Sequence, residues 1–303
     1  MSFQLLVGID ATQMDATVMR QAAFYCRQLP VRQVLFLHVV AAEPVPESLR
    51  TAHQSLAPLP EEVARKRIEG ELDAHFRPYA ETPVSLSVEH GNTTEQVLLK
   101  TQDLDIRLLM LGKKLHYSGQ GVSASRIANM APCPVAFVPE TAREPVDRIL
   151  VPVDFSDHSA AALREALQWA DAFKAQVLCH HIIGLPAVYY PYIPTDQVEP
   201  ELVSHAQERF QAFLQEHELP DNLNCHFTIG RSNNPARDVY TQAQRVQADL
   251  IVVGARGRTP AASFVLGSLA ENLAYGSYAI PILVHKPHEE RMGLLQALRE
   301  RFF

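Results

Sequence analysis

The chain has 303 residues, of which 47% are apolar and 20% charged, so it can bury large cores and is not a disordered polypeptide. Its 27 Lys and Arg residues against 34 Asp and Glu residues give a formal net charge of −7, which disfavours docking on nucleic acid phosphates or anionic lipid. No apolar stretch reaches the length of a transmembrane helix, and the first residues lack a signal-peptide pattern. We therefore expect a cytoplasmic protein with neither a membrane nor a nucleic acid as a partner.

Four apolar segments occur twice along the chain, in the same order each time. Leu5–Asp10 (LLVGID) corresponds to Ile149–Asp154 (ILVPVD), which lies 144 residues later. The other three pairs are Val34–Val40 with Val177–Ile183, Leu108–Gly112 with Leu250–Gly254, and Pro134–Val138 with Pro281–Val284. Because the chain is also about twice as long as a common domain, the repeat predicts two tandem domains, residues 1–143 and residues 144–303.

Each apolar segment is short and unalternated, which is typical of a strand buried on both faces of a parallel sheet. The segments between them have helical periodicity, which indicates βαβ units with right-handed crossovers. We therefore predict an α/β fold with two tandem, doubly wound, Rossmann-like domains, each with a parallel sheet of roughly five strands and helices on both faces. The predicted helices are 61–76 and 94–101 in the first copy, and 160–174, 201–217 and 235–246 in the second.

A glycine-rich loop follows the fourth apolar segment of the second copy. It has the pattern G-x2-G-x9-G-S, with glycines at 254, 257 and 267 and a serine at 268. Glycines at a strand end let backbone N–H groups approach an anion, and a helix that begins at Gly267–Ser268 directs its positive dipole to the same place. Arg256 and Arg258 add positive charge inside the loop. The pattern therefore predicts a phosphate site, with a glycine-rich turn and solvated arginines as the alternative.

Taken together, these patterns resemble the universal stress protein family. The residues that carry the resemblance are Ile149–Ser159, the pair His181–Ile182, Ala248–Gly254 and the glycine loop that ends at Ser268. The resemblance covers nearly the whole chain as two tandem copies, of which the second has the ATP-binding type of motif. It implies that Asp154 contacts the ribose and Ile182 the adenine, while Gly254, Gly257, Gly267 and Ser268 hold the phosphates.

The predicted cofactor is ATP, with or without Mg²⁺. Asp154 also suits its role on physical grounds, because an acidic side chain at the switch point of a doubly wound sheet can accept hydrogen bonds from ribose hydroxyls. The alternative role for Asp154 is to cap the following helix, for which Asp157 is the better candidate. The complete set of predicted cofactor-binding residues is Pro152, Val153, Asp154, Ile182, Gly254, Arg256, Gly257, Arg258, Gly267, Ser268 and Leu269.

The segment from Gly267 to Pro281 is one residue longer than the family pattern, with Tyr275–Tyr278 where a helix end is expected.

The first copy retains Asp10 and Val39 but not the glycine loop. Leu115 stands where the second glycine is expected, the spacing to Gly121 is shorter than in the second copy, and Val122 replaces the serine. A side chain at position 115 obstructs the close approach of backbone to phosphate. We therefore predict a degenerate first domain that binds no ATP, with a partial nucleoside pocket as the alternative.

Thirteen histidines leave a metal site open, and none is assigned. His180 and His181 are adjacent on a predicted strand and face opposite sides of the sheet, while His285 and His288 flank a proline near the last strand. No catalytic residue is assigned either. Neither glycine loop continues into a phosphate-loop Lys-Ser/Thr pair, and no general base is evident, so we expect at most a slow ATPase.

We interpret the sequence as a cytoplasmic universal stress protein whose second domain binds ATP and which acts as a nucleotide-responsive stress-resistance factor. One alternative is a slow ATPase or nucleotidyl-transfer enzyme. The other is a module for another small or lipid-like ligand, with the tyrosine-rich segment Pro186–Pro200 as a flap. We also expect the two domains to pair through their last strands, which are otherwise apolar sheet edges, and leave a homodimer open.

Overall fold

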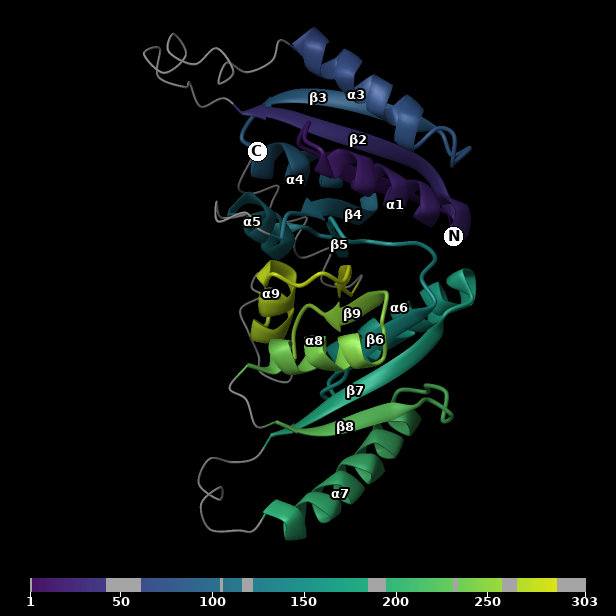
Figure 1. The fold of residues 1–303 in the computed structure, drawn as a ribbon, viewed down its shortest axis with the longest axis vertical. Helices are drawn as coiled ribbons and strands as arrows, with labels where there is room; N and C mark the ends of the chain where they lie inside the picture. Colours follow the sequence, from purple (N-terminus) through teal and green to yellow (C-terminus); the bar gives the residue numbers. More distant parts are fainter. Residues whose placement is uncertain are drawn as a thin grey trace. The chain divides into compact units, whose positions relative to one another are not determined.

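The computed structural model describes residues 2–41, 61–103, 106–115, 122–184, 195–230, 234–257 and 266–287. The chain divides into two compact units, the first extending to Glu144 and the second beginning at Pro145 (Figure 1). The sequence-predicted segment Pro186–Pro200 lies largely outside the described residues, as does His288.

The first unit alternates strands with helices from its first described residues onward. Its elements are β1 (Phe3–Ile9), α1 (Met14–Gln28), β2 (Val31–Ala41), α3 (Glu61–His75), β3 (Val84–Gly91), α4 (Thr93–Asp103), β4 (Ile106–Lys113), α5 (Val122–Met130) and β5 (Val135–Pro139). All the strand pairs recorded within it are parallel, and the strand order is β3-β2-β1-β4-β5.

The second unit repeats this pattern. Its elements are β6 (Arg148–Pro152), α6 (Asp157–Phe173), β7 (Gln176–Gly184), α7 (Thr195–Glu216), β8 (Cys225–Gly230), α8 (Pro235–Arg245), β9 (Leu250–Gly254), α9 (Ser268–Tyr275) and β10 (Ile282–His285). The strand order is β8-β7-β6-β9-β10, again with parallel pairs. Both units therefore have the same doubly wound topology, and the predicted α/β fold is confirmed.

Burial explains why the strand segments lack alternation. Every residue of β5 and of β9 is buried, because helices cover both faces of each sheet. In the first unit α1 packs beside α3, and α4 packs beside α5. This pairing is expected, because right-handed connections that run in opposite directions along a sheet place their helices on opposite faces. In the second unit α8 packs beside α9 in the same way (Figure 1).

Two helix starts differ from the sequence prediction. Ser156, and not Asp157, caps α6: its side chain accepts the Ser159 amide while the Ser159 hydroxyl accepts the Ser156 amide, so a reciprocal capping box leaves Asp157 as the first helical residue. Helix α7 begins at Thr195 and contains Pro200, which we had placed before the helix. A proline near a helix start removes few hydrogen bonds, so it does not end the helix.

The segment after Gly267 forms α9 and then a short turn that contains Gly276 and Tyr278. The helix ends at Tyr275, and Gly276 donates its amide to the Asn272 carbonyl in an extended conformation. A Cβ at position 276 would lie 2.4 Å from the Tyr278 ring, so only glycine fits there. Tyr278 in turn packs on Tyr240 of α8, with ring centroids 4.6 Å apart. The end of α9 is therefore fixed by Gly276 and by the packing of Tyr278 on Tyr240.

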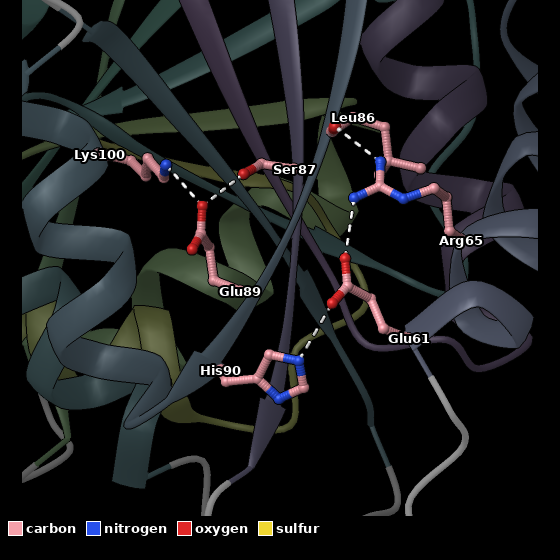
Figure 2. A network of polar contacts seen from close by, with 7 residues as sticks. All are labelled: Glu61, Arg65, Leu86, Ser87, Glu89, His90 and Lys100. Atoms are coloured by element: carbon pink, nitrogen blue, oxygen red, sulfur yellow. Dashed lines mark hydrogen bonds and ion pairs between the residues drawn. The ribbon is translucent and has the colours of Figure 1, made fainter.

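The edge strand β3 of the first unit is flanked by charged side chains (Figure 2). Lys100 of α4 lies 2.7 Å from Glu89. On α3, which also packs against β3, Glu61 contacts both Arg65 and His90, and Arg65 donates to the backbone carbonyl of Leu86. Charges along an edge strand oppose pairing with a foreign strand, which is a common protection of open sheets.

Candidate functional site

The two central strands of the second unit place the predicted site residues side by side. β6 ends at Pro152 and β9 ends at Gly254, and the strands are paired, with Ile149 opposite Leu250. The chain winds from β6 toward β7 and β8, and then returns to the other side of β6 to form β9. The carboxyl ends of β6 and β9 therefore border the switch point, where doubly wound sheets bind ligands.

Asp154 lies at this point, in a tight turn between β6 and α6. Its Oδ1 accepts hydrogen bonds from the amide of Ser156 (3.2 Å) and from the Ser156 hydroxyl (2.5 Å). Phe155, between them, has a φ of 64°, in the left-handed region that a bulky aromatic residue rarely adopts. The turn therefore holds the Asp154 carboxylate in one place at the carboxyl end of β6.

Aromatic packing holds Phe155 in this conformation. Its ring stacks on the His181 imidazole, with centroids 4.2 Å apart, and lies 5.6 Å from the ring of Phe213. The Nδ1 of His181 donates to the Val153 carbonyl at 2.8 Å, which fixes the strand end just before Asp154. The guanidinium carbon of Arg209 lies 5.1 Å from the Phe155 ring centroid. Aromatic pairs of this kind contribute about 0.5–1.5 kcal/mol each beyond burial, enough to offset the backbone strain.

The first two glycines of the loop occupy positions that have no room for a side chain. A Cβ on Gly257 would lie 2.6 Å from Oδ2 of Asp154, and a Cβ on Gly254 would lie 2.7 Å from the carbonyl oxygen of His158. Both distances are well below those that Cβ atoms tolerate. The second glycine therefore lets the loop backbone lie directly against the Asp154 carboxylate.

The third glycine brings the start of α9 to the same place. Gly267 is the N-cap residue of α9, and its amide donates to the Ala255 carbonyl at 2.8 Å. A Cβ at position 267 would lie 3.6 Å from the Gly257 backbone nitrogen, so the two segments of the loop are in close contact. The positive end of α9 thus faces the region between Gly257 and Asp154.

The remaining predicted residues lie around this centre. Pro152 and Val153 are buried, Ile182 and Leu269 are half-buried, and Ser268 is exposed at the first position of α9. Ile182 is near the carboxyl end of β7, where Gly230 makes room for it: a Cβ at 230 would lie 2.9 Å from the Ile182 Cγ2. Arg256 is half-buried within the loop. Arg258 lies outside the described residues.

The turn that holds Asp154, residues 154–156, is here called the Asp-presenting turn. The first unit repeats it at residues 10–12 but does not repeat the glycine contacts. Thr12 donates to Asp10 Oδ1 at 2.5 Å, Ala11 has a φ of 59°, and His38 Nδ1 donates to the Ile9 carbonyl at 3.1 Å. These three features match those at Ser156, Phe155 and His181. The turn is therefore common to both units.

The two units differ in what faces the second carboxylate oxygen. In the first unit the Lys114 ammonium lies 2.7 Å from Asp10 Oδ2, and hydrogen bonds from Lys114 and Thr12 outweigh partial burial and lower the Asp10 pKa. A backbone glycine faces the same oxygen of Asp154 in the second unit. Sequence inspection identified Leu115 as the obstruction and missed Lys114, because the contact joins residues 104 apart in sequence.

Sequence inspection also missed a series of polar contacts that joins α6 to the last residue of β10 and to the start of the loop. Glu165 of α6 accepts a hydrogen bond from the Trp169 indole at 2.7 Å, and its other oxygen lies 3.8 Å from Nδ1 of His285. The backbone carbonyl of His285 accepts the amide of Ala255, the residue that follows Gly254 in the loop, at 2.9 Å. Burial raises the pKa of Glu165 and lowers the pKa of His285 to about 4.

The histidines do not form a metal centre in the described ranges, where no three His, Cys, Asp or Glu side chains gather around a common point. His180 and His181 face opposite sides of β7, as predicted: His180 pairs with the Thr228 hydroxyl at 2.8 Å, and His181 with the Val153 carbonyl. Burial, followed by the nearby His226 and His181, lowers the His180 pKa to about 4. None of the described helices is both long and apolar enough to span a membrane.

Comparisons with known proteins agree with this fold. A universal stress protein of Methanocaldococcus jannaschii is 27% identical over 144 residues, which is 47% of this chain and 84% of the relative. A crystal structure of a functionally unknown protein from Pseudomonas aeruginosa has a TM-score of 0.65 at 17% identity, covering 98% of this chain and 97% of the other. A universal stress protein from Archaeoglobus fulgidus has a TM-score of 0.59 at 15% identity, covering 94% and 96% of the two chains.

These two structures share the fold over nearly the whole chain. The model of the universal stress protein family matches residues 145–285, which include the Asp154 turn, the glycine loop and β10. The second unit of the chain is therefore a universal stress protein domain.

Proposed function

We propose that the second unit binds ATP and that the protein is a cytoplasmic, nucleotide-responsive stress-resistance factor. The observation that carries the proposal is the opposition of Asp154 and Gly257, which lets loop backbone lie against a carboxylate at the switch point. A carboxylate accepts hydrogen bonds from a ribose diol, while the adjacent backbone amides and the N-terminus of α9 favour phosphate. A nucleotide joins these two groups within one molecule.

The remaining contacts follow from the same placement. Ile182 gives the base an apolar surface at the end of β7, one strand away from Asp154. Arg256 adds a positive charge to the loop, which a triphosphate requires in a chain of net charge −7. If Mg²⁺ accompanies the nucleotide, the phosphate oxygens and water supply most of its ligands.

We propose a binding protein and not a turnover enzyme. A backbone cradle stabilises bound triphosphate, whereas catalysis needs interactions that become stronger in the transition state. Within the described part of the site, Asp154 is the only carboxylate that faces Gly257, and its Oδ1 is engaged by Ser156. A slow ATPase or nucleotidyl-transfer activity is the second candidate, since Arg256 is placed where it can stabilise phosphate charge.

The test is to identify the ligand that the purified protein releases on denaturation, and then to measure the binding of ATP, ADP and adenosine by calorimetry. The proposal predicts that ATP binds, and that adenosine, which lacks phosphates, binds more weakly. Release of a lipid or another small molecule, without measurable binding of any nucleotide, would contradict it. Conversion of co-purified ATP to ADP within minutes would favour the enzyme.

A further inference from the structure

The glycine loop begins on a backbone bond to β10. Ala255, which follows the first glycine, donates its amide to the carbonyl of His285 at 2.9 Å and accepts the Gly267 amide at 2.8 Å. A displacement of the His285 backbone therefore moves both segments of the loop together. His285 is the last residue of β10, so its position depends on what holds its side chain.

Glu165 is the group that faces this side chain. Its Oε2 lies 3.8 Å from His285 Nδ1, and its Oε1 accepts the Trp169 indole N–H at 2.7 Å. The side chains of His285 and Glu165 are 12% and 25% exposed, so little water screens their interaction. Glu165 and Trp169 are one turn apart on α6, which packs against both β9 and β10.

The side chains of Glu165 and His285 lie close together without a hydrogen bond between them. In the described part of the chain, Nδ1 of His285 is buried without a hydrogen-bond partner, although a carboxylate oxygen lies just beyond bonding distance. The titratable groups around it are Glu165 and, electrostatically, His158 of the same helix. Because burial raises the Glu165 pKa and lowers the His285 pKa, the first proton that the pair takes up goes to the Glu165 carboxyl, whose O–H can donate to Nδ1 once the two atoms lie about 1 Å closer.

We propose that Glu165 is a positioning residue of the phosphate loop that acts through His285. The Glu165 carboxylate sets the place of the imidazole, and the His285 carbonyl sets the place of Ala255 at the start of the loop. The inference rests on the proposed nucleotide site for its effect on binding, whereas the contact itself can be tested without any nucleotide. As pH falls, Glu165 and His285 form a hydrogen bond, and the shift of His285 displaces Ala255. The loop then binds phosphate more weakly.

Trp169 allows the ligand-free test, because it is the single tryptophan of the chain and is bonded to Glu165. Its fluorescence is recorded between about pH 4 and pH 7, a range that includes the titration of a buried carboxyl with a raised pKa. We expect a transition in the wild type that is absent in Glu165→Gln, whose side chain does not titrate but keeps an acceptor for the indole. We also expect the transition to shift in His285→Asn, which removes the imidazole that faces the Glu165 carboxyl. Asp15→Asn, which neutralises a buried carboxylate of the first unit, is the matched control and leaves it unchanged.

The second measurement is ATP affinity across the same pH range, compared with the wild type at each pH so that titration of the ligand itself cancels. Glu165→Gln is expected to weaken binding about threefold to tenfold at neutral pH. His285→Asn keeps the wild-type affinity near neutrality but loses the additional weakening at low pH. Circular dichroism confirms that each variant is folded.

The outcomes separate the two proposals. If the wild type binds no ATP but Trp169 titrates as described, the nucleotide proposal fails and the Glu165–His285 contact stands. If ATP binds but folded Glu165→Gln and His285→Asn reproduce the wild-type affinity at every pH, the positioning role is wrong. A fluorescence transition that is unchanged in His285→Asn overturns the coupling itself.

Discussion

Gly257 and Asp154 are in direct contact across the switch point of the second unit: the position of a Cβ at residue 257 lies 2.6 Å from the Asp154 Oδ2. The contact ties a loop that follows β9 to a turn that follows β6. A side chain at position 257 would therefore displace either the Asp154 carboxylate or the loop.

The first prediction concerns this glycine. Gly257→Ala inserts a methyl group against the Asp154 carboxylate, so the loop must withdraw, and we expect ATP affinity to fall at least about tenfold, which corresponds to about 1.4 kcal/mol. The matched control is Gly184→Ala, because a Cβ at position 184 meets nothing within 4 Å. Calorimetric titration of both variants checks the prediction. Equal affinities in the two variants would contradict it.

A second prediction concerns stoichiometry. The Lys114 ammonium faces the Asp10 oxygen whose counterpart in Asp154 faces loop backbone, and Leu115 replaces the second glycine in the sequence, so we expect one ATP per chain. Asp154→Asn retains an acceptor for the Ser156 amide but loses the charge, and should weaken binding about 10- to 100-fold. Asp10→Asn should leave ATP affinity unchanged. Two ATP per chain, or equal effects of the two substitutions, would disprove this assignment.

Turnover is the third prediction. Because no general base or water-orienting group is identified, we expect hydrolysis slower than about one ATP per minute in a single-turnover assay with Mg²⁺. Arg256→Ala should weaken binding more than it changes this rate. A wild-type rate above about one per second that is lost in Arg256→Ala would place the protein among the ATPases.

The fourth prediction concerns the pH dependence of stability in the first unit. Asp15 is buried next to Asp10, and burial raises its pKa to about 6 from an ordinary value of 3.8. The folded state therefore holds the proton more tightly than the unfolded state, so stability is greatest below the unfolded pKa and is lost as pH rises through about 6. The shift corresponds to a change of up to about 3 kcal/mol.

Asp15→Asn tests this dependence. The amide oxygen can still accept the Asp10 backbone N–H, a bond of 3.1 Å in the native turn, but it carries no charge. Urea unfolding between about pH 4 and pH 8 should show that the variant gains stability relative to the wild type as pH rises. A difference that stays constant across this range would mean that Asp15 does not titrate in the folded protein.

The elements that the sequence predicted well are those with a local signal. Unalternated apolar runs such as Leu250–Gly254 marked the buried strands, and glycine spacing marked the loop around Gly257. The sequence placed the N-cap of α6 within Ser156–Ser159, but composition alone does not single out the reciprocal Ser156–Ser159 pair. Contacts such as Asp10–Lys114 and Glu165–His285 join residues more than 100 positions apart, and no periodicity records them.

The repetition of the Asp-presenting turn in both units implies that the site is modular. The left-handed residue, the hydroxyl donor and the bracing histidine persist in the first unit without a glycine loop, so this turn serves the architecture of the sheet whether or not a ligand is bound. The residues beside the second carboxylate oxygen then distinguish the copy that we propose binds ATP from the other. Lys114 stands beside Asp10 while the turn around it stays intact, so the same scaffold carries unequal chemistry in the two units.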